Sequence, residues 1–93
     1  MAERKAFSAR VHGRVQGVGF RYSTRSQAKR LGVRGFVRNE RDGTVRVDCE
    51  GNPEAVEQMA EWLKEGPRMA RVSDVDFTWR DEEQGYARFT VDG

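Results

Sequence analysis

The chain is poor in the groups that most often carry catalysis or hold metal ions. Its 93 residues include one cysteine and one histidine. A single cysteine cannot close an internal disulfide, and no set of metal ligands stands at a recognisable spacing. No Ser-His or Cys-His arrangement with an obvious base can be built either. We therefore expect Cys49 to be a buried apolar residue and His12 to be a solvent-facing strand residue.

Long hydrophobic runs are also missing. No apolar run approaches the length of a membrane-spanning helix, and residues 1–5 are not followed by the apolar core of a signal peptide. No linker, repeat or low-complexity segment interrupts the sequence. We expect one cytoplasmic domain over residues 1–93, monomeric and without a membrane partner.

Charge is nearly balanced over the whole chain but unevenly distributed along it. The formal net charge is +2, whereas residues 1–47 carry 12 Lys or Arg against 3 Asp or Glu, and residues 48–93 carry 5 against 12. The first half is therefore at +9 and the second at −7. A basic half can attract a small anion or nucleic acid, although solvated surface charge explains most of the arginines equally well.

Hydrophobic periodicity predicts seven elements. They are a strand over 7–13, a helix over 21–31, strands over 34–39 and 45–49, a helix over 53–65, and strands over 71–79 and 85–91. The turn signal Asp42-Gly43 makes the second and third strands antiparallel neighbours. The order βαββαβ with an extra C-terminal strand predicts a ferredoxin-like α/β sandwich of the α+β class. We expect an antiparallel sheet with two helices on one face.

A glycine-rich run, Gly-Arg-Val-Gln-Gly-Val-Gly-Phe-Arg over residues 13–21, joins the first strand to the first helix. Gly13, Gly17 and Gly19 can adopt positive φ, so that successive N–H groups converge on an anion. The helix N-terminus and Arg21 add positive charge at the same place. The spacing fits neither a dinucleotide fingerprint nor a Walker loop. On the residues alone, a purely structural turn remains the alternative.

Asn39 is the candidate for orienting a water molecule. It shares the face of Val37 near the end of the second strand, and right-handed crossovers allow it to reach the glycine-rich turn. Its amide can accept from water and donate elsewhere, but it is a poor proton acceptor. An asparagine that merely ends a strand before a turn is the alternative.

The groups present favour a substrate whose leaving group needs little help. An alcohol leaves a phosphate ester as a very basic alkoxide, and the sequence offers no metal site or tuned acid to assist it. A carboxylate has a conjugate acid with a pKa of about 4 to 5 and leaves readily. Positioning and charge stabilisation by amides, Arg21 and Asn39 can then suffice.

The run over residues 13–21 closely resembles the signature of the acylphosphatase family, whose small members hydrolyse carboxyl phosphates. The likeness continues at Ala28, Leu31-Gly32, Gly35, Val37-Arg38-Asn39, Asp42-Gly43 and Glu50-Gly51. It covers essentially the whole chain. One departure is Phe36, where the family often has Trp, and this keeps an aromatic residue.

The resemblance implies a role for each candidate residue. The phosphate cradle would comprise Gln16, Gly17, Val18, Gly19, Phe20 and Arg21. Arg21 would be the catalytic arginine and Asn39 the water-orienting residue. No metal and no cofactor are implied; an acyl phosphate would be the substrate, and inorganic phosphate the product and a competitive inhibitor.

Two rival functions come from other classes. A nucleic-acid-binding module on this fold would use sheet aromatics for stacking, but the strands lack an RNP1-like run of alternating aromatics. A regulatory protein that only senses a phosphate or an acyl phosphate is the other rival, because the fold does not fix the function. Asn39 distinguishes a hydrolase from a sensor, because a sensor has no need to order water.

Overall fold

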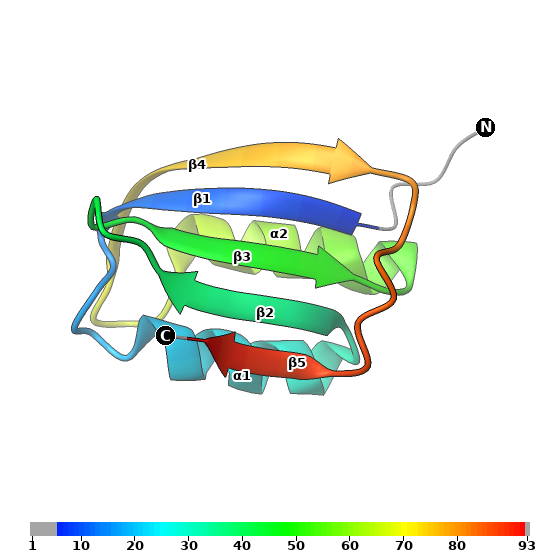
Figure 1. The fold of residues 1–93 in the computed structure, drawn as a ribbon. Helices are drawn as coiled ribbons and strands as arrows, with labels where there is room; N and C mark the ends of the chain where they lie inside the picture. Colours follow the sequence, from blue (N-terminus) through cyan, green and yellow to red (C-terminus); the bar gives the residue numbers. More distant parts are fainter. Residues whose placement is uncertain (1–5, 93) are drawn as a thin grey trace.

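The computed structural model describes residues 6–92, so the expectation for residues 1–5 lies outside the described part of the chain. The elements are β1 (Ala6–Arg14), α1 (Phe20–Leu31), β2 (Arg34–Asn39), β3 (Val45–Glu50), α2 (Pro53–Glu65), β4 (Arg71–Arg80) and β5 (Phe89–Asp92). The strands form one sheet in the order β4-β1-β3-β2-β5, and both helices cover the same face (Figure 1). The predicted ferredoxin-like sandwich with an additional strand is confirmed.

The sheet is mixed rather than wholly antiparallel. β1 pairs antiparallel with β3 and β4, and β2 with β3, but β5 runs parallel to β2. The cause is visible in Figure 1: the segment after β4 crosses to the opposite edge of the sheet at the same end, so β5 starts where β2 starts. Strand periodicity identifies a strand but not the edge that it joins.

β5 is also shorter than the predicted strand over 85–91, because its first part binds a side chain instead of a neighbouring strand. The backbone amides of Gln84, Gly85 and Tyr86 donate to the carboxylate of Glu50 at 2.6, 2.9 and 2.9 Å. This carboxylate is completely buried. The segment before β5 is therefore a strap fastened over the end of β3.

The core lies between the sheet and the helices, as the alternation predicted. β1 buries Phe7, Ala9 and Val11 there, and the facing residues of β3 and α2 are equally buried. Cys49 belongs to this core, and burial, followed by the charges of Glu50 and Asp48, raises the pKa of its thiol to about 12. Its predicted place as a buried residue is confirmed.

The helix ends that the sequence predicted at Gly32 and at Asn52-Pro53 are confirmed. Asn52 caps α2, with its Oδ1 accepting from the amide of Glu54 at 3.0 Å, and Pro53 is the first helical residue. α1 ends at Gly32, whose φ of +75° is left-handed. The sequence signals thus locate the start of α2 and the end of α1.

Candidate functional site: the glycine-rich loop and the β2–β3 turn

The loop between β1 and α1 is anchored at both ends and exposed in the middle. Val15 and Phe20 are 1% and 2% exposed and belong to the core. Between them, Gly17 and Gly19 are exposed, each with φ of +76°, while Val18 keeps an ordinary φ. Alternation between positive and negative φ along a short loop is the kind of backbone from which anion nests are built.

The start of α1 carries no internal cap. Gly19 is the N-cap residue and has no side chain to offer, and the first turn holds no acidic residue. The amides of residues 16–20 donate no hydrogen bond to an acceptor within residues 6–92. Because unpaired helix N-terminal amides together with the helix dipole favour a negative group, this end of α1 is suited to an anion.

Arg21 lies in the first turn of α1, directly after the buried Phe20, and is half-buried. Its guanidinium lies 6.0 Å from the ring centroid of the exposed Tyr22. Arg21 thus places a fixed positive charge at the start of α1, next to the predicted phosphate cradle.

Asn39 is the last residue of β2 and is half-buried. It alternates with Val37, which is completely buried, so both occupy the face of the sheet that the helices cover. Its Oδ1 is buried and accepts no hydrogen bond from residues 6–92. A buried amide oxygen without a donor costs about 1–3 kcal/mol, so it is a ready acceptor for a bound molecule.

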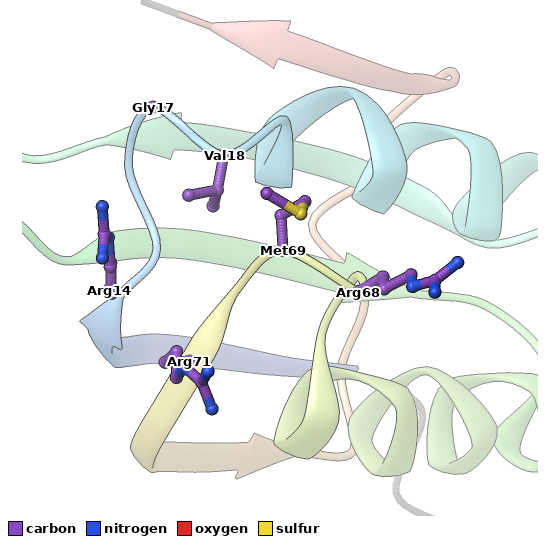
Figure 2. Close-up of a pocket in the computed structure, with 6 residues that line it drawn as sticks. All are labelled: Arg14, Gly17, Val18, Arg68, Met69 and Arg71. Atoms are coloured by element: carbon purple, nitrogen blue, oxygen red, sulfur yellow. The ribbon is translucent and has the colours of Figure 1, made fainter.

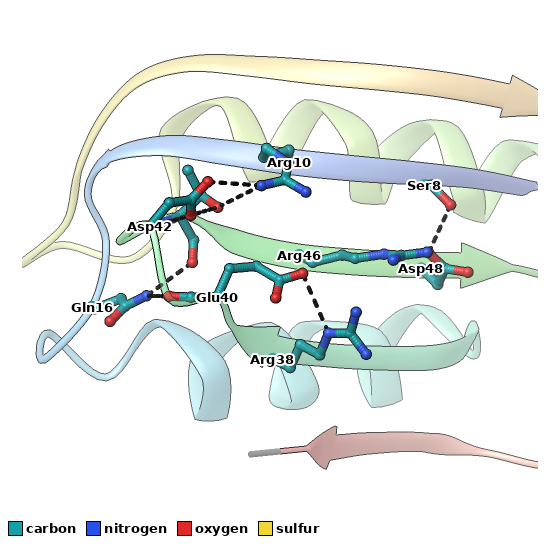
Figure 3. A network of polar contacts seen from close by, with 9 residues as sticks. Ser8, Arg10, Gln16, Arg38, Glu40, Asp42, Arg46 and Asp48 are labelled. Carbon is teal, nitrogen blue, oxygen red and sulfur yellow. Dashed lines mark hydrogen bonds and ion pairs between the residues drawn. The ribbon is translucent and has the colours of Figure 1, made fainter.

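Gln16 joins the loop to the turn that follows Asn39. Its Nε2 donates to the backbone carbonyl of Glu40 at 2.8 Å and to that of Thr44 at 2.9 Å (Figure 3). Since Glu40 directly follows Asn39, these bonds bring the loop and the end of β2 together. This role was not predictable from the sequence, because nothing in the spacing of Gln16 indicates a contact 24 and 28 residues away.

The same turn is fixed from its other side. Asp42 accepts from the amide and the hydroxyl of Thr44 at 3.0 and 2.6 Å, and from Arg10 of β1 at 2.9 Å (Figure 3). These contacts, those of Thr44 first, hold the pKa of Asp42 below its ordinary value. The predicted Asp42-Gly43 turn is confirmed, and Gly43 donates to the carbonyl of Glu40 at 3.2 Å.

A basic cleft of about 580 Å³ borders the other side of the loop. It is lined by Arg14, Gly17, Val18, Arg68, Met69 and Arg71. Met69 is 72% exposed, and Figure 2 shows the three arginine side chains pointing in different directions. The cleft therefore supplies a diffuse positive field beside the loop rather than a converging set of donors.

Elsewhere the described residues offer little further chemistry. His12 lies on the open face of the sheet with its Nε2 2.9 Å from a carboxylate oxygen of Asp76. Within residues 6–92 no group of three or more His, Cys, Asp or Glu is arranged to hold a metal ion. No helix in this range is long and apolar enough to cross a membrane.

The fold and the loop define a class first: a ferredoxin-like α+β protein with an exposed glycine-rich loop at the start of its first helix. A sequence profile of the acylphosphatase family matches residues 7–91. The acylphosphatase of Salinibacter ruber is 53% identical over 87 residues, covering 94% of this chain and 92% of that protein. That of Thermococcus kodakarensis is 50% identical over 84 residues, covering 90% and 91%.

Comparison with solved structures indicates the same family. The crystal structure of acylphosphatase from Bacillus subtilis superposes with a TM-score of 0.91 at 34% identity, covering 95% of this chain and 98% of that one. The chain belongs to the acylphosphatase family. Its homologues are named acylphosphatases, which are hydrolases that act on acid anhydrides.

Proposed function

We propose that this protein hydrolyses acyl phosphates to a carboxylate and inorganic phosphate by direct attack of an oriented water, without a metal. The observation that carries the proposal is the loop of residues 16–20, whose amides are unpaired within the described chain, fastened beside Asn39 with its buried, unpaired Oδ1. One half of this arrangement suits a phosphoryl group and the other suits a nucleophilic water.

In the proposed site the amides of residues 16–20 and the guanidinium of Arg21 bind the phosphoryl oxygens. Gly17 and Gly19 contribute by their left-handed backbone, which turns neighbouring amides toward one side. In a loose phosphoryl-transfer transition state, charge spreads over the equatorial oxygens, and donors fixed in advance stabilise it. Arg21 adds a charge-assisted, two-pronged donor.

Asn39 positions the water in line with the bond that breaks. Its Oδ1 accepts a hydrogen bond from the water without removing a proton, so Asn39 acts by orientation. The water oxygen bonds to phosphorus as the bond from phosphorus to the carboxyl oxygen breaks. The carboxylate departs with the electron pair, and a phosphate oxygen of the substrate takes the proton. No covalent phosphoenzyme forms.

The nature of the leaving group makes a metal and a general acid unnecessary. A carboxylate is stable as an anion at neutral pH, whereas an alkoxide is not. The same contacts bind the product, so inorganic phosphate should compete with the substrate. The cytoplasmic location, the monomeric state and the absence of a nucleic-acid partner stay predictions of the sequence.

Hydrolysis of benzoyl phosphate in the presence of excess EDTA tests the proposal, with p-nitrophenyl phosphate as the comparison. We expect saturable, chelator-resistant release of benzoate and phosphate, and negligible turnover of the aryl ester. Loss of activity in EDTA that returns with a divalent ion would refute metal independence. Phosphate binding without turnover of benzoyl phosphate would identify a sensor instead of an enzyme.

A further inference from the structure

The side chain of Gln16 does something that a backbone cradle does not require. Both protons of its amide are used, one on the carbonyl of Glu40 and one on that of Thr44, and the side chain is half-buried. Glu40 and Thr44 are the two ends of the turn between β2 and β3. The Gln16 amide thus spans the turn and ties both of its ends to the loop (Figure 3).

The turn does not need Gln16 to satisfy its own backbone. The carbonyl of Glu40 already accepts from the amide of Gly43 at 3.2 Å, and that of Thr44 accepts from the amide of Glu40 at 2.8 Å. A carbonyl oxygen has two lone pairs, so Gln16 takes only the second place on each. Its bonds therefore fix the position of the loop relative to the turn and complete neither.

We propose that Gln16 is a positioning residue, which sets the separation between the phosphate cradle and the water held by Asn39. This inference rests on the proposed function. The backbone of residue 16 would belong to the cradle while its side chain holds the residue next to Asn39. Because in-line attack is sensitive to displacements of about 1 Å, loss of the Gln16 bonds should slow the chemical step more than it weakens phosphate binding.

Gln16→Met tests this directly, because methionine keeps a similar length but donates no hydrogen bond. We expect kcat for benzoyl phosphate to fall about tenfold, while the inhibition constant of inorganic phosphate changes less than about twofold. Gln58→Met is the matched control, since Gln58 is exposed on α2 and should keep wild-type values. Thermal unfolding of each variant ensures that rates are compared on folded protein.

A double-mutant cycle with Asn39→Ala separates positioning from a general weakening of the loop. If Gln16 acts through Asn39, Gln16→Met should lower kcat by less than about twofold when Asn39 is already alanine. An equal loss of kcat in both backgrounds would overturn the inference, as would a loss of phosphate affinity as large as the loss of kcat. If Gln16→Met does not fold, Gln16→Asn, which keeps the amide on a shorter stem, takes its place.

The wild-type and Asn39→Ala arms of the cycle report on the proposed function by themselves. Absence of turnover in the wild type, or unchanged kcat in Asn39→Ala, would overturn that function and this inference together. This inference alone would be overturned if the wild type turns over, Asn39→Ala lowers kcat, and Gln16→Met lowers kcat by the same factor in both backgrounds.

Discussion

The two ends of the sheet use the same device to different effect. At one end, the amides of residues 84–86 bind the buried carboxylate of Glu50, and the Arg34 guanidinium lies 3.6 Å from it. The glycine-rich loop between β1 and α1 lies at the other end (Figure 1). It carries the amides of residues 16–20, and Arg21 follows in the first turn of α1. Both are clusters of backbone donors next to an arginine, and such a cluster selects an anion.

The difference is the source of the anion. Glu50 comes from the chain itself, so the strap before β5 is closed and the cluster is structural. No carboxylate within residues 6–92 is hydrogen-bonded to the loop amides, and the loop glycines are exposed. At the filled end of the sheet, the carboxylate of Glu50 binds the amides of residues 84–86 and supports the fold. At the open end, the amides of residues 16–20 are suited to an external anion such as a phosphoryl group.

The largest effect is expected from removing Arg21, and almost none from removing Arg34. Arg21→Ala should lower kcat/KM for benzoyl phosphate by about a thousandfold or more and weaken inhibition by phosphate, because it removes the fixed charge on the transferring group. Arg34→Ala, the matched change at the filled end, should leave kcat within about twofold. Steady-state kinetics on both variants decide, and equal losses would erase the distinction between the ends.

Asn39→Ala should lower kcat by about a hundredfold with little change in phosphate affinity, because the cradle does not include this side chain. Kinetics combined with phosphate inhibition measure both quantities. A parallel loss of phosphate affinity would instead assign Asn39 to the cradle.

Glu50→Gln should lower the free energy of unfolding by about 2 kcal/mol, because an NH₂ group would replace one of the oxygens that the amides of residues 84–86 face. Urea unfolding measures this, and kcat of the folded variant should stay close to wild type. A stable but inactive variant would show that the filled end takes part in catalysis.

Cys49, beside Glu50, gives the filled end a pH signature. The pKa of its thiol is raised from 9.0 to about 12, mainly by burial. Between these two pH values the thiol stays protonated in the folded protein but ionises in the unfolded chain. Its stabilising effect is present below pH 9.0 and falls by about 1.4 kcal/mol per pH unit up to about pH 12. Stability of Cys49→Ala should therefore decline less steeply over this range, and identical slopes would contradict the assignment.

The basic cleft should matter least. Arg14→Met is expected to raise KM about two- to threefold at low salt without changing kcat, because Arg14 contributes only to the field beside the loop. The effect should shrink as salt is added. A drop in kcat would place Arg14 in contact with the reacting group.

Much of the open end was predictable from sequence, because its signals are local. Glycine spacing marked the left-handed positions of the loop, and alternation placed Asn39 on the face of Val37. The Asp42-Gly43 signal located the turn that follows. Each of these depends on neighbours within a few residues, which the sequence displays directly.

The filled end was not predictable, because its contacts join segments far apart in the chain. Glu50 follows the alternating core positions of β3 and reads as an ordinary solvent-facing residue, yet the strap buries it from 34 to 36 positions away. The same limit hid the side-chain bonds of Gln16 and the parallel pairing of β5. Neither hydrophobic period nor turn chemistry carries information about such long-range partners.

Titration of ¹⁵N-labelled protein with inorganic phosphate tests the contrast between the two ends most directly. The amide resonances of residues 16–20 should shift saturably, and those of residues 84–86 should stay in place because Glu50 already occupies them. Saturating phosphate that leaves residues 16–20 unmoved, or that shifts both groups alike, would contradict the assignment of the open end as the phosphate site.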